Sequence, residues 1–146
     1  MKTIGVDLEP KAVAVTPGNV HVTNTNSRNV SMIDPTNNTV TATLTTGDSP
    51  SGVAALPVNG LYAYVTNKDS HNVSVIDPAT ESVIDTIDVG TMPIGVAVSP
   101  DGSHVYVANW RDRTLSVIEP HHHAAVSTIQ VGDHPGVWQS SWAPKA

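Results

Sequence analysis

A segment of about forty residues occurs three times in this chain, and this repeat constrains the fold more than any other feature. Each copy contains a four-residue motif with Val at its second position and Asn at its last, followed by a motif resembling Val-Ser-Val-Ile-Asp-Pro. The first motif occupies residues 21–24, 64–67 and 106–109, and the second occupies residues 30–35, 73–78 and 115–120. A fixed period of this size indicates units that pack against their sequence neighbours. We therefore expect a single repeat-built domain over residues 1–146.

The third copy, between Gly90 and Gly132, has the pattern of four short strands joined by polar turns. The expected strands are residues 94–98, 104–108, 115–118 and 125–131. The first three are almost wholly apolar, which predicts burial on both faces, whereas the fourth strand of a copy has the mixed character of an edge strand. The pattern predicts an all-β fold made of four-stranded antiparallel meanders of the β-propeller blade type.

Regularly spaced Gly and Pro residues set the limits of each unit. The expected blades are residues 7–46, 47–89 and 90–131, with a single-strand stub at each end, residues 2–6 and 133–142. Gly52, Gly95 and Gly136 stand at the start of a first strand, where neighbouring blades crowd together. Close approach of two backbones favours a residue without a side chain, so we expect these glycines at the blade contacts.

These motifs resemble the YVTN-type β-propeller repeats of prokaryotic surface-layer-like proteins. Residues 64–67 read Tyr-Val-Thr-Asn, residues 73–77 read Val-Ser-Val-Ile-Asp, and residues 95–102 read Gly-Val-Ala-Val-Ser-Pro-Asp-Gly. The resemblance covers roughly residues 3 to 137. It implies a propeller of the seven-bladed kind, often located at the cell surface or outside the cell. Some relatives are similar to lactonases or redox-associated propellers, but none of those activities has a motif that carries over to this chain.

Composition excludes several functional classes. The formal net charge is −6 and Lys and Arg form no run, which argues against binding to nucleic acid. There is no cysteine, which excludes disulfide bonds and thiolate chemistry. No apolar stretch is long enough for insertion into a membrane. The first residues contain no apolar core of a signal peptide in the chain as given. No cofactor-binding motif appears, so we expect no cofactor.

Three blades are too few to close a propeller, which usually needs about four to eight. The outer faces of the first and last blades would then expose flat apolar surface, a feature of interaction sites. Two explanations are open: a ring completed by copies of the chain, or a fragment of a longer propeller. We favour assembly, because the repeat boundaries are intact, and we expect a homo-oligomer formed through the exposed blade faces.

Functional residues of propellers usually lie on the loops at one end of the blades. On this chain that end should collect Arg28, Asp48, Lys68, Asp69, His71, Met92, Trp110, Arg111, Asp112, Arg113 and His134. Trp110 with the nearby Arg111 and Arg113 has a composition typical of binding hot spots and could stack on a sugar ring or hold a carboxylate. The alternative is a solvated loop with ion pairs of little energetic value.

Histidines and acids elsewhere admit structural interpretations. His121 and His123 could share a metal ion at the opposite end, or form an exposed polar turn. His21 stands where the other copies have Tyr, which indicates a packing substitution. The acid that precedes Pro in each copy, including Asp34 and Asp77, is expected to cap a turn.

Two functions remain open from the sequence. The first is a non-enzymatic binding or assembly module that takes a protein or carbohydrate ligand. The alternative is a lactonase-like or metal-site propeller enzyme with its site near the ring axis. No nucleophile elbow, phosphate loop or zinc-protease motif favours the enzyme.

Overall fold

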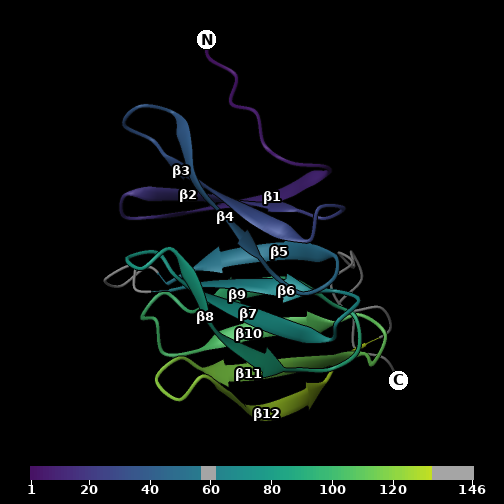
Figure 1. Cartoon of the computed structure of the whole chain (residues 1–146). Helices are drawn as coiled ribbons and strands as arrows, with labels where there is room; N and C mark the ends of the chain where they lie inside the picture. The colour runs from purple at the N-terminus through teal and green to yellow at the C-terminus, as the bar shows by residue number, and fades with distance from the viewer. Residues whose placement is uncertain (57–61, 133–146) are drawn as a thin grey trace.

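The computed structural model describes residues 1–56 and 62–132, and these form three four-stranded antiparallel sheets (Figure 1). Within each sheet the strands follow chain order, so each sheet is a meander. We call the sheets blades 1, 2 and 3. Blade 1 comprises β1 (Pro10–Thr16), β2 (Asn19–Asn24), β3 (Asn29–Asp34) and β4 (Thr39–Thr45); blade 2 comprises β5 (Pro50–Ala55), β6 (Ala63–Asn67), β7 (Asn72–Asp77) and β8 (Ser82–Asp88); blade 3 comprises β9 (Pro93–Val98), β10 (Val105–Asn109), β11 (Thr114–Glu119) and β12 (Ala124–Gln130). The all-β blade architecture predicted from the repeat is confirmed.

The three blades are stacked in chain order, with blade 2 between the other two (Figure 1). The first strands β1, β5 and β9 lie beside one another across the stack, and the fourth strands are furthest from them within each blade. Because blade 2 lies in the middle, one of its faces packs against blade 1 and the other packs against blade 3. Cross-strand partners of an antiparallel sheet lie on the same face, which identifies the residues on each side.

Aliphatic side chains fill both spaces between blades. Between blades 1 and 2 the buried residues are Val30, Met32, Ala63, Val65 and Ile76. Between blades 2 and 3 they are Leu56, Tyr64, Val73, Val75, Ile87, Val105, Val107 and Ile118. Blade 2 is buried on both faces because its strands supply residues to both clusters, as the apolar texture of the second and third strands predicted.

A threonine hydroxyl joins each pair of adjacent blades. Thr66 Oγ1 accepts a hydrogen bond from the Gly52 amide (2.8 Å) and donates one to the Ile94 carbonyl of blade 3 (2.7 Å). Thr23 Oγ1 donates in the same way to the Ser51 carbonyl of blade 2 (3.2 Å). A side chain on Gly52 would collide with the Ile94 carbonyl, which confirms that backbones approach closely here.

The outer face of blade 1 is open to solvent. Val13 and Val15 are 63% and 67% exposed, although they hold the positions that Val96 and Val98 hold in blade 3. Val96 and Val98 pack against the cluster between blades 2 and 3. The first-strand burial predicted from the sequence therefore fails for β1, because no described blade precedes it.

The outer face of blade 3 is also less covered than its counterpart. Tyr106 and Leu115 are half-buried, whereas the corresponding Tyr64 and Val73 of blade 2 are fully buried. Gly95 faces only the Ala108 side chain, at 3.8 Å from the position of an added Cβ. The crowding expected at Gly95 is therefore missing, because no described blade packs on this face. Gly136 lies outside the described residues.

The expected strand at residues 2–6 is not a strand in this structure. Hydrogen bonds on both sides of the segment nevertheless tie it to blade 1. Lys2 Nζ donates to the Asn37 carbonyl (3.4 Å), and Asp7 Oδ2 accepts a bond from Asn29 Nδ2 (2.6 Å). A fourth strand pairs with the third strand of its own blade, and no such partner exists among the described residues. The second expected stub, 133–142, lies outside the described residues. No described helix is long and apolar enough to cross a membrane.

Candidate functional site

The loops between second and third strands form one end of the blade stack. Arg28, His71 and Arg113 close these loops, each with a left-handed backbone (φ 56°, 58° and 58°). The Arg28 and His71 carbonyls accept hydrogen bonds from the amides of Thr46 and Val89, where the fourth strand leaves the blade. A left-handed residue other than glycine costs about 1–2 kcal/mol, and these bonds help to offset that cost.

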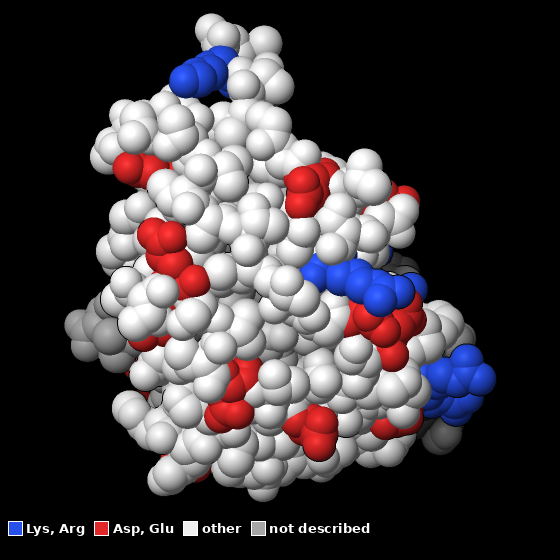
Figure 2. All heavy atoms as spheres, in the orientation of Figure 1, with Lys and Arg blue, Asp and Glu red and all other residues white. Residues whose placement is uncertain are grey.

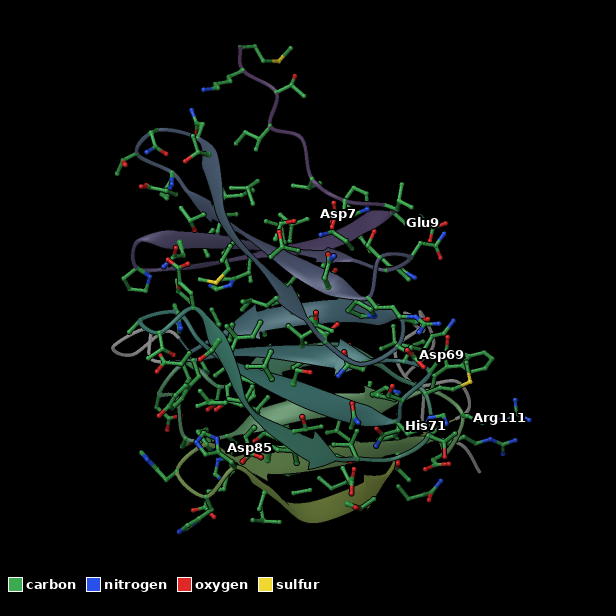
Figure 3. The ribbon with its side chains drawn as sticks, viewed as in Figure 1. Asp7, Glu9, Asp69, His71, Asp85 and Arg111 are labelled. Carbon is green, nitrogen blue, oxygen red and sulfur yellow. The ribbon has the colours of Figure 1, made fainter. Side chains whose placement is uncertain are left out.

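The connections between blades lie at the same end. The Lys68 amide donates to the Ser49 carbonyl, and the Trp110 amide donates to the Met92 carbonyl. Figure 3 shows Asp69, His71 and Arg111 at this end and Asp85 at the other. The prediction that both loop sets share one end is therefore confirmed for the described residues. We call it the loop end. His134 lies outside the described residues.

Several polar side chains at the loop end hold the loops in place. His71 Nδ1 accepts a hydrogen bond from the Met92 amide (3.1 Å), and Asp112 Oδ2 accepts one from the Thr91 amide (2.7 Å). Asp69 Oδ2 accepts a hydrogen bond from the Ser49 hydroxyl. Much of the hydrogen-bonding capacity here is therefore spent within the protein.

Charge at the loop end is mixed, as Figure 2 shows on the face that it displays, where Lys and Arg side chains lie next to acidic ones. Arg28 Nε lies 3.3 Å from Asp48 Oδ1, and both side chains are largely exposed (69% and 51%). An exposed pair of this kind stabilises a fold by about 1 kcal/mol at most. Arg111 is exposed and Trp110 is half-buried. These two can present a cation and an aromatic surface to a ligand.

At the opposite end the acids cap turns. Asp34 Oδ1 accepts hydrogen bonds from the Thr36 hydroxyl and amide (2.6 and 2.8 Å), which lower the pKa of Asp34. Asp77 Oδ1 accepts one from the Ala79 amide (2.9 Å). Bonds from Ser103 lower the pKa of Asp101 to about 2. Turn capping is thus confirmed for Asp34 and Asp77, and these pKa shifts have a local cause.

The three adjacent histidines have separate neighbours. The His123 ring meets Tyr62 edge-on, with centroids 5.1 Å apart. His122 Nδ1 lies 3.1 Å from Glu119 Oε2, and His121 is exposed. Among the described residues no three His, Cys, Asp or Glu side chains gather as a ligand set. The metal site at His121 and His123 therefore has no third described ligand.

The remaining side chains with shifted pKa values, His21 and Tyr64, are in the core. His21 is fully buried, Nε2 lies 3.0 Å from Thr16 Oγ1, and burial lowers the pKa of the imidazole. Burial raises the pKa of the Tyr64 phenol. The expected packing role of His21 is confirmed.

Sequence reasoning missed the bridging hydroxyls of Thr23 and Thr66. The sequence does hold a signal for these bridges. The third residue of the four-residue motif is Thr in the two blades that a described blade follows, and it is Ala108 in the third blade, which none follows.

A model of the DUF5074 family, described as a domain of unknown function, matches residues 5–146. The chain belongs to this family. The DUF5074 chain is also 57% identical, over 54 residues, to the PE-PGRS family protein PE_PGRS18 of Mycobacterium tuberculosis. That match covers 36% of the chain and 12% of the relative.

Solved structures resemble the DUF5074 chain over most of its length. Hydrazine synthase of Kuenenia stuttgartiensis matches with a TM-score of 0.81 and 28% identity, over 86% of this chain and 37% of the other. Apo AztD of Citrobacter koseri matches with a TM-score of 0.68 and 17% identity, over 80% and 34%. The chain thus spans about a third of the length of these solved chains. The matches support a propeller-like module.

Proposed function

We propose that this propeller module is a non-enzymatic binding and assembly unit, and that copies of the chain cover one another's open blade faces. The observation that carries the proposal is the exposure of Val13 and Val15, at 63% and 67%. Burying an exposed valine contributes about 1.5 kcal/mol or more, so an unpartnered valine face favours association.

The two open faces are complementary in kind. The outer face of blade 3 carries the half-buried Tyr106 and Leu115 and the buried Val117. In blade 2 the same positions are Tyr64, Val73 and Val75, which pack on blade 3. The outer face of blade 1 corresponds to the face of blade 3 that receives them. A head-to-tail contact between copies would repeat the packing seen twice within one chain, and such contacts close into rings.

The size of the similar solved chains supports the same proposal. The module matches 37% and 34% of two such chains, so a ring of their size needs more blades than one copy supplies. Further copies are one source of blades, and a longer polypeptide is the other. The mass of the protein in solution distinguishes these two sources.

The loop end is the proposed ligand surface, for a protein or carbohydrate. Its Trp110 and Arg111 lie on loops held by backbone bonds, which suits a fixed recognition surface. The carboxylate of Asp112 and the imidazole of His71 are hydrogen-bonded to backbone amides, an arrangement that favours a structural role over a catalytic one. The resemblance to surface-layer-like repeats favours a location at the cell surface.

Replacement of Val15 by Asp tests the assembly directly. The side chain is exposed, so the variant should fold, but it would place a charge at the centre of the proposed contact. We expect V15D to raise the dissociation constant of the assembly at least about a hundredfold. Sedimentation velocity of matched concentrations measures this.

T41D is the matched control, because Thr41 is exposed on the outer strand of the same blade. It should sediment like the wild-type protein. Equal sedimentation of V15D and wild type, with both folded by circular dichroism, would refute assembly through this face.

A further inference from the structure

A groove of about 470 Å³ opens between blades 2 and 3, away from the first strands. One wall is the end of β8 and the residues after it, including Asp88, Val89 and Gly90. The other wall belongs to β11, β12 and the preceding loop. The volume falls within the range of small-molecule sites, about 300–1,000 Å³.

The repeat itself explains why the groove is open here. Ala125 lines the groove, paired with Ile118, and the corresponding residue of blade 2 is Val83, paired with Ile76. Val83 packs against the cluster between blades 1 and 2. Two methyl groups that help to fill that first interblade space are therefore absent from the second.

The groove is also charged where the corresponding positions are neutral. Asp88 stands in place of Thr45, and Asp112 stands in place of Ser70. The turn does not require an acid, because Ser70 Oγ accepts a bond from the Asp48 amide (2.7 Å) just as Asp112 Oδ2 accepts one from the Thr91 amide (2.7 Å). Asp112 Oδ1 makes no described hydrogen bond and remains available to a ligand.

Three hydroxyls complete the polar wall, those of Thr114, Ser116 and Thr128. Ser116 is only 3% exposed. Its Oγ and the Thr114 Oγ1 accept hydrogen bonds from Asn109 Nδ2 (2.8 and 3.0 Å), and neither hydroxyl has a described acceptor for its own hydrogen. Asn109 Oδ1 is buried without a partner, as are the equivalent Asn24 and Asn67 Oδ1 atoms of the other blades. A buried hydroxyl with unused donor capacity gains from a ligand that supplies an acceptor.

From this geometry we infer that the groove binds a small amino sugar. The two carboxylates are acceptors only, so they select a ligand rich in donors and repel an anion. An ammonium group satisfies Asp88 or Asp112, and ring hydroxyls exchange hydrogen bonds with Thr114, Ser116 and Thr128. This inference goes beyond the proposed assembly and does not depend on it.

Titration of the full chain with glucosamine, glucose and glucuronate tests the inference. These three probes share a hydroxylated ring and differ in charge. In two-dimensional amide NMR spectra we expect glucosamine to shift the amides of Gly90, Thr114 and Thr128, glucose to do so more weakly and glucuronate not at all. Addition of Ca²⁺ alone should leave these amides unchanged.

Two substitutions import residues that the repeat already tolerates. A125V fills the groove with the residue of blade 2, and D88T replaces the acid with the residue of blade 1. Each should weaken glucosamine binding about tenfold or more, because one removes space and the other a charged acceptor. D85S is the control, because it removes an exposed acid outside the groove and imports the Ser127 of blade 3.

Four results would each overturn the inference. The first is the absence of any shift with glucosamine at tens of millimolar. The second is equal binding by wild type and A125V, and the third is a shift of the groove amides by Ca²⁺ in place of the sugar. A loss of binding in D85S as large as that in D88T would also show that the effect is general electrostatics.

Discussion

The same pair of buried polar residues recurs in each of the three blades. Asn24, Asn67 and Asn109 end the second strand of each blade, and each donates through Nδ2 to a serine hydroxyl two positions into the third strand at 2.8 Å. These serines are Ser31, Ser74 and Ser116. All six side chains are buried, and a buried polar group is tolerated when it is hydrogen-bonded. The repeated Asn and Ser thus fasten the second strand to the third.

Blade 1 has a buried imidazole, His21, at the position where the other two blades have Tyr. Its pKa is lowered by burial, so the unfolded chain, with a pKa near 6.5, binds the proton more tightly than the folded chain does. The stability that depends on neutral His21 is fully present above pH 6.5 and is lost as the pH falls below it. Blade 1 is therefore sensitive to acid.

We expect the urea midpoint of wild type to fall between about pH 7 and pH 5, and to fall less in H21Y. Tyr occupies this slot in both other blades, so the variant should fold. The six other histidines are present in both proteins, so the difference between the two pH profiles isolates His21. Identical pH profiles would contradict a buried neutral imidazole.

At the scale of strands and turns, a bridging hydroxyl holds one blade to the next. Thr66 Oγ1 serves the Gly52 amide and the Ile94 carbonyl at once, inside the stack. Removing the hydroxyl leaves a part-buried donor and a part-buried acceptor unpaired, and each unpaired group costs up to about 1–3 kcal/mol.

T66V should therefore lower the free energy of unfolding by about 2 kcal/mol or more, measured by urea denaturation. The replacement keeps the shape of the side chain, so the loss reports the hydrogen bonds. T43V is the control, because Thr43 is exposed on β4 and its side chain makes no described hydrogen bond; its effect should stay within about 0.5 kcal/mol. Similar losses in both variants would rule out the bridge.

The strands themselves could be predicted from the sequence. The expected strand at 94–98 is β9 at Pro93–Val98, and the expected strand at 115–118 is β11 at Thr114–Glu119. Runs of Val and Ile between Pro, Gly and Asn leave few other readings. Residues 2–6 look similar locally but form no strand, because pairing needs a neighbouring strand that composition does not reveal.

The site was harder to predict than the strands. The loop end could be predicted, because the chain reverses direction at every loop of a meander and alternate loops therefore lie at the same end. The hydrogen bonds that occupy His71 and Asp112 depend on loop geometry, which no pattern in the sequence specifies. The groove at Ala125 could not be predicted, because it depends on which residues of blades 2 and 3 face each other.

At the scale of the whole molecule, the three blades formed by the described residues make a stack whose outer faces carry apolar side chains. Blade 2 shows how such faces are covered, because both of its faces are packed against a neighbour. Exposed Val13 and Val15 on blade 1 and half-buried Tyr106 on blade 3 are the corresponding uncovered positions. The central claim is that copies of the chain cover them.

The molar mass of the wild-type chain in solution tests this claim most directly. Light scattering coupled to size exclusion, at micromolar concentration, should give a molar mass of two or more whole multiples of 15.3 kDa. A single species of 15.3 kDa would contradict assembly through the open blade faces.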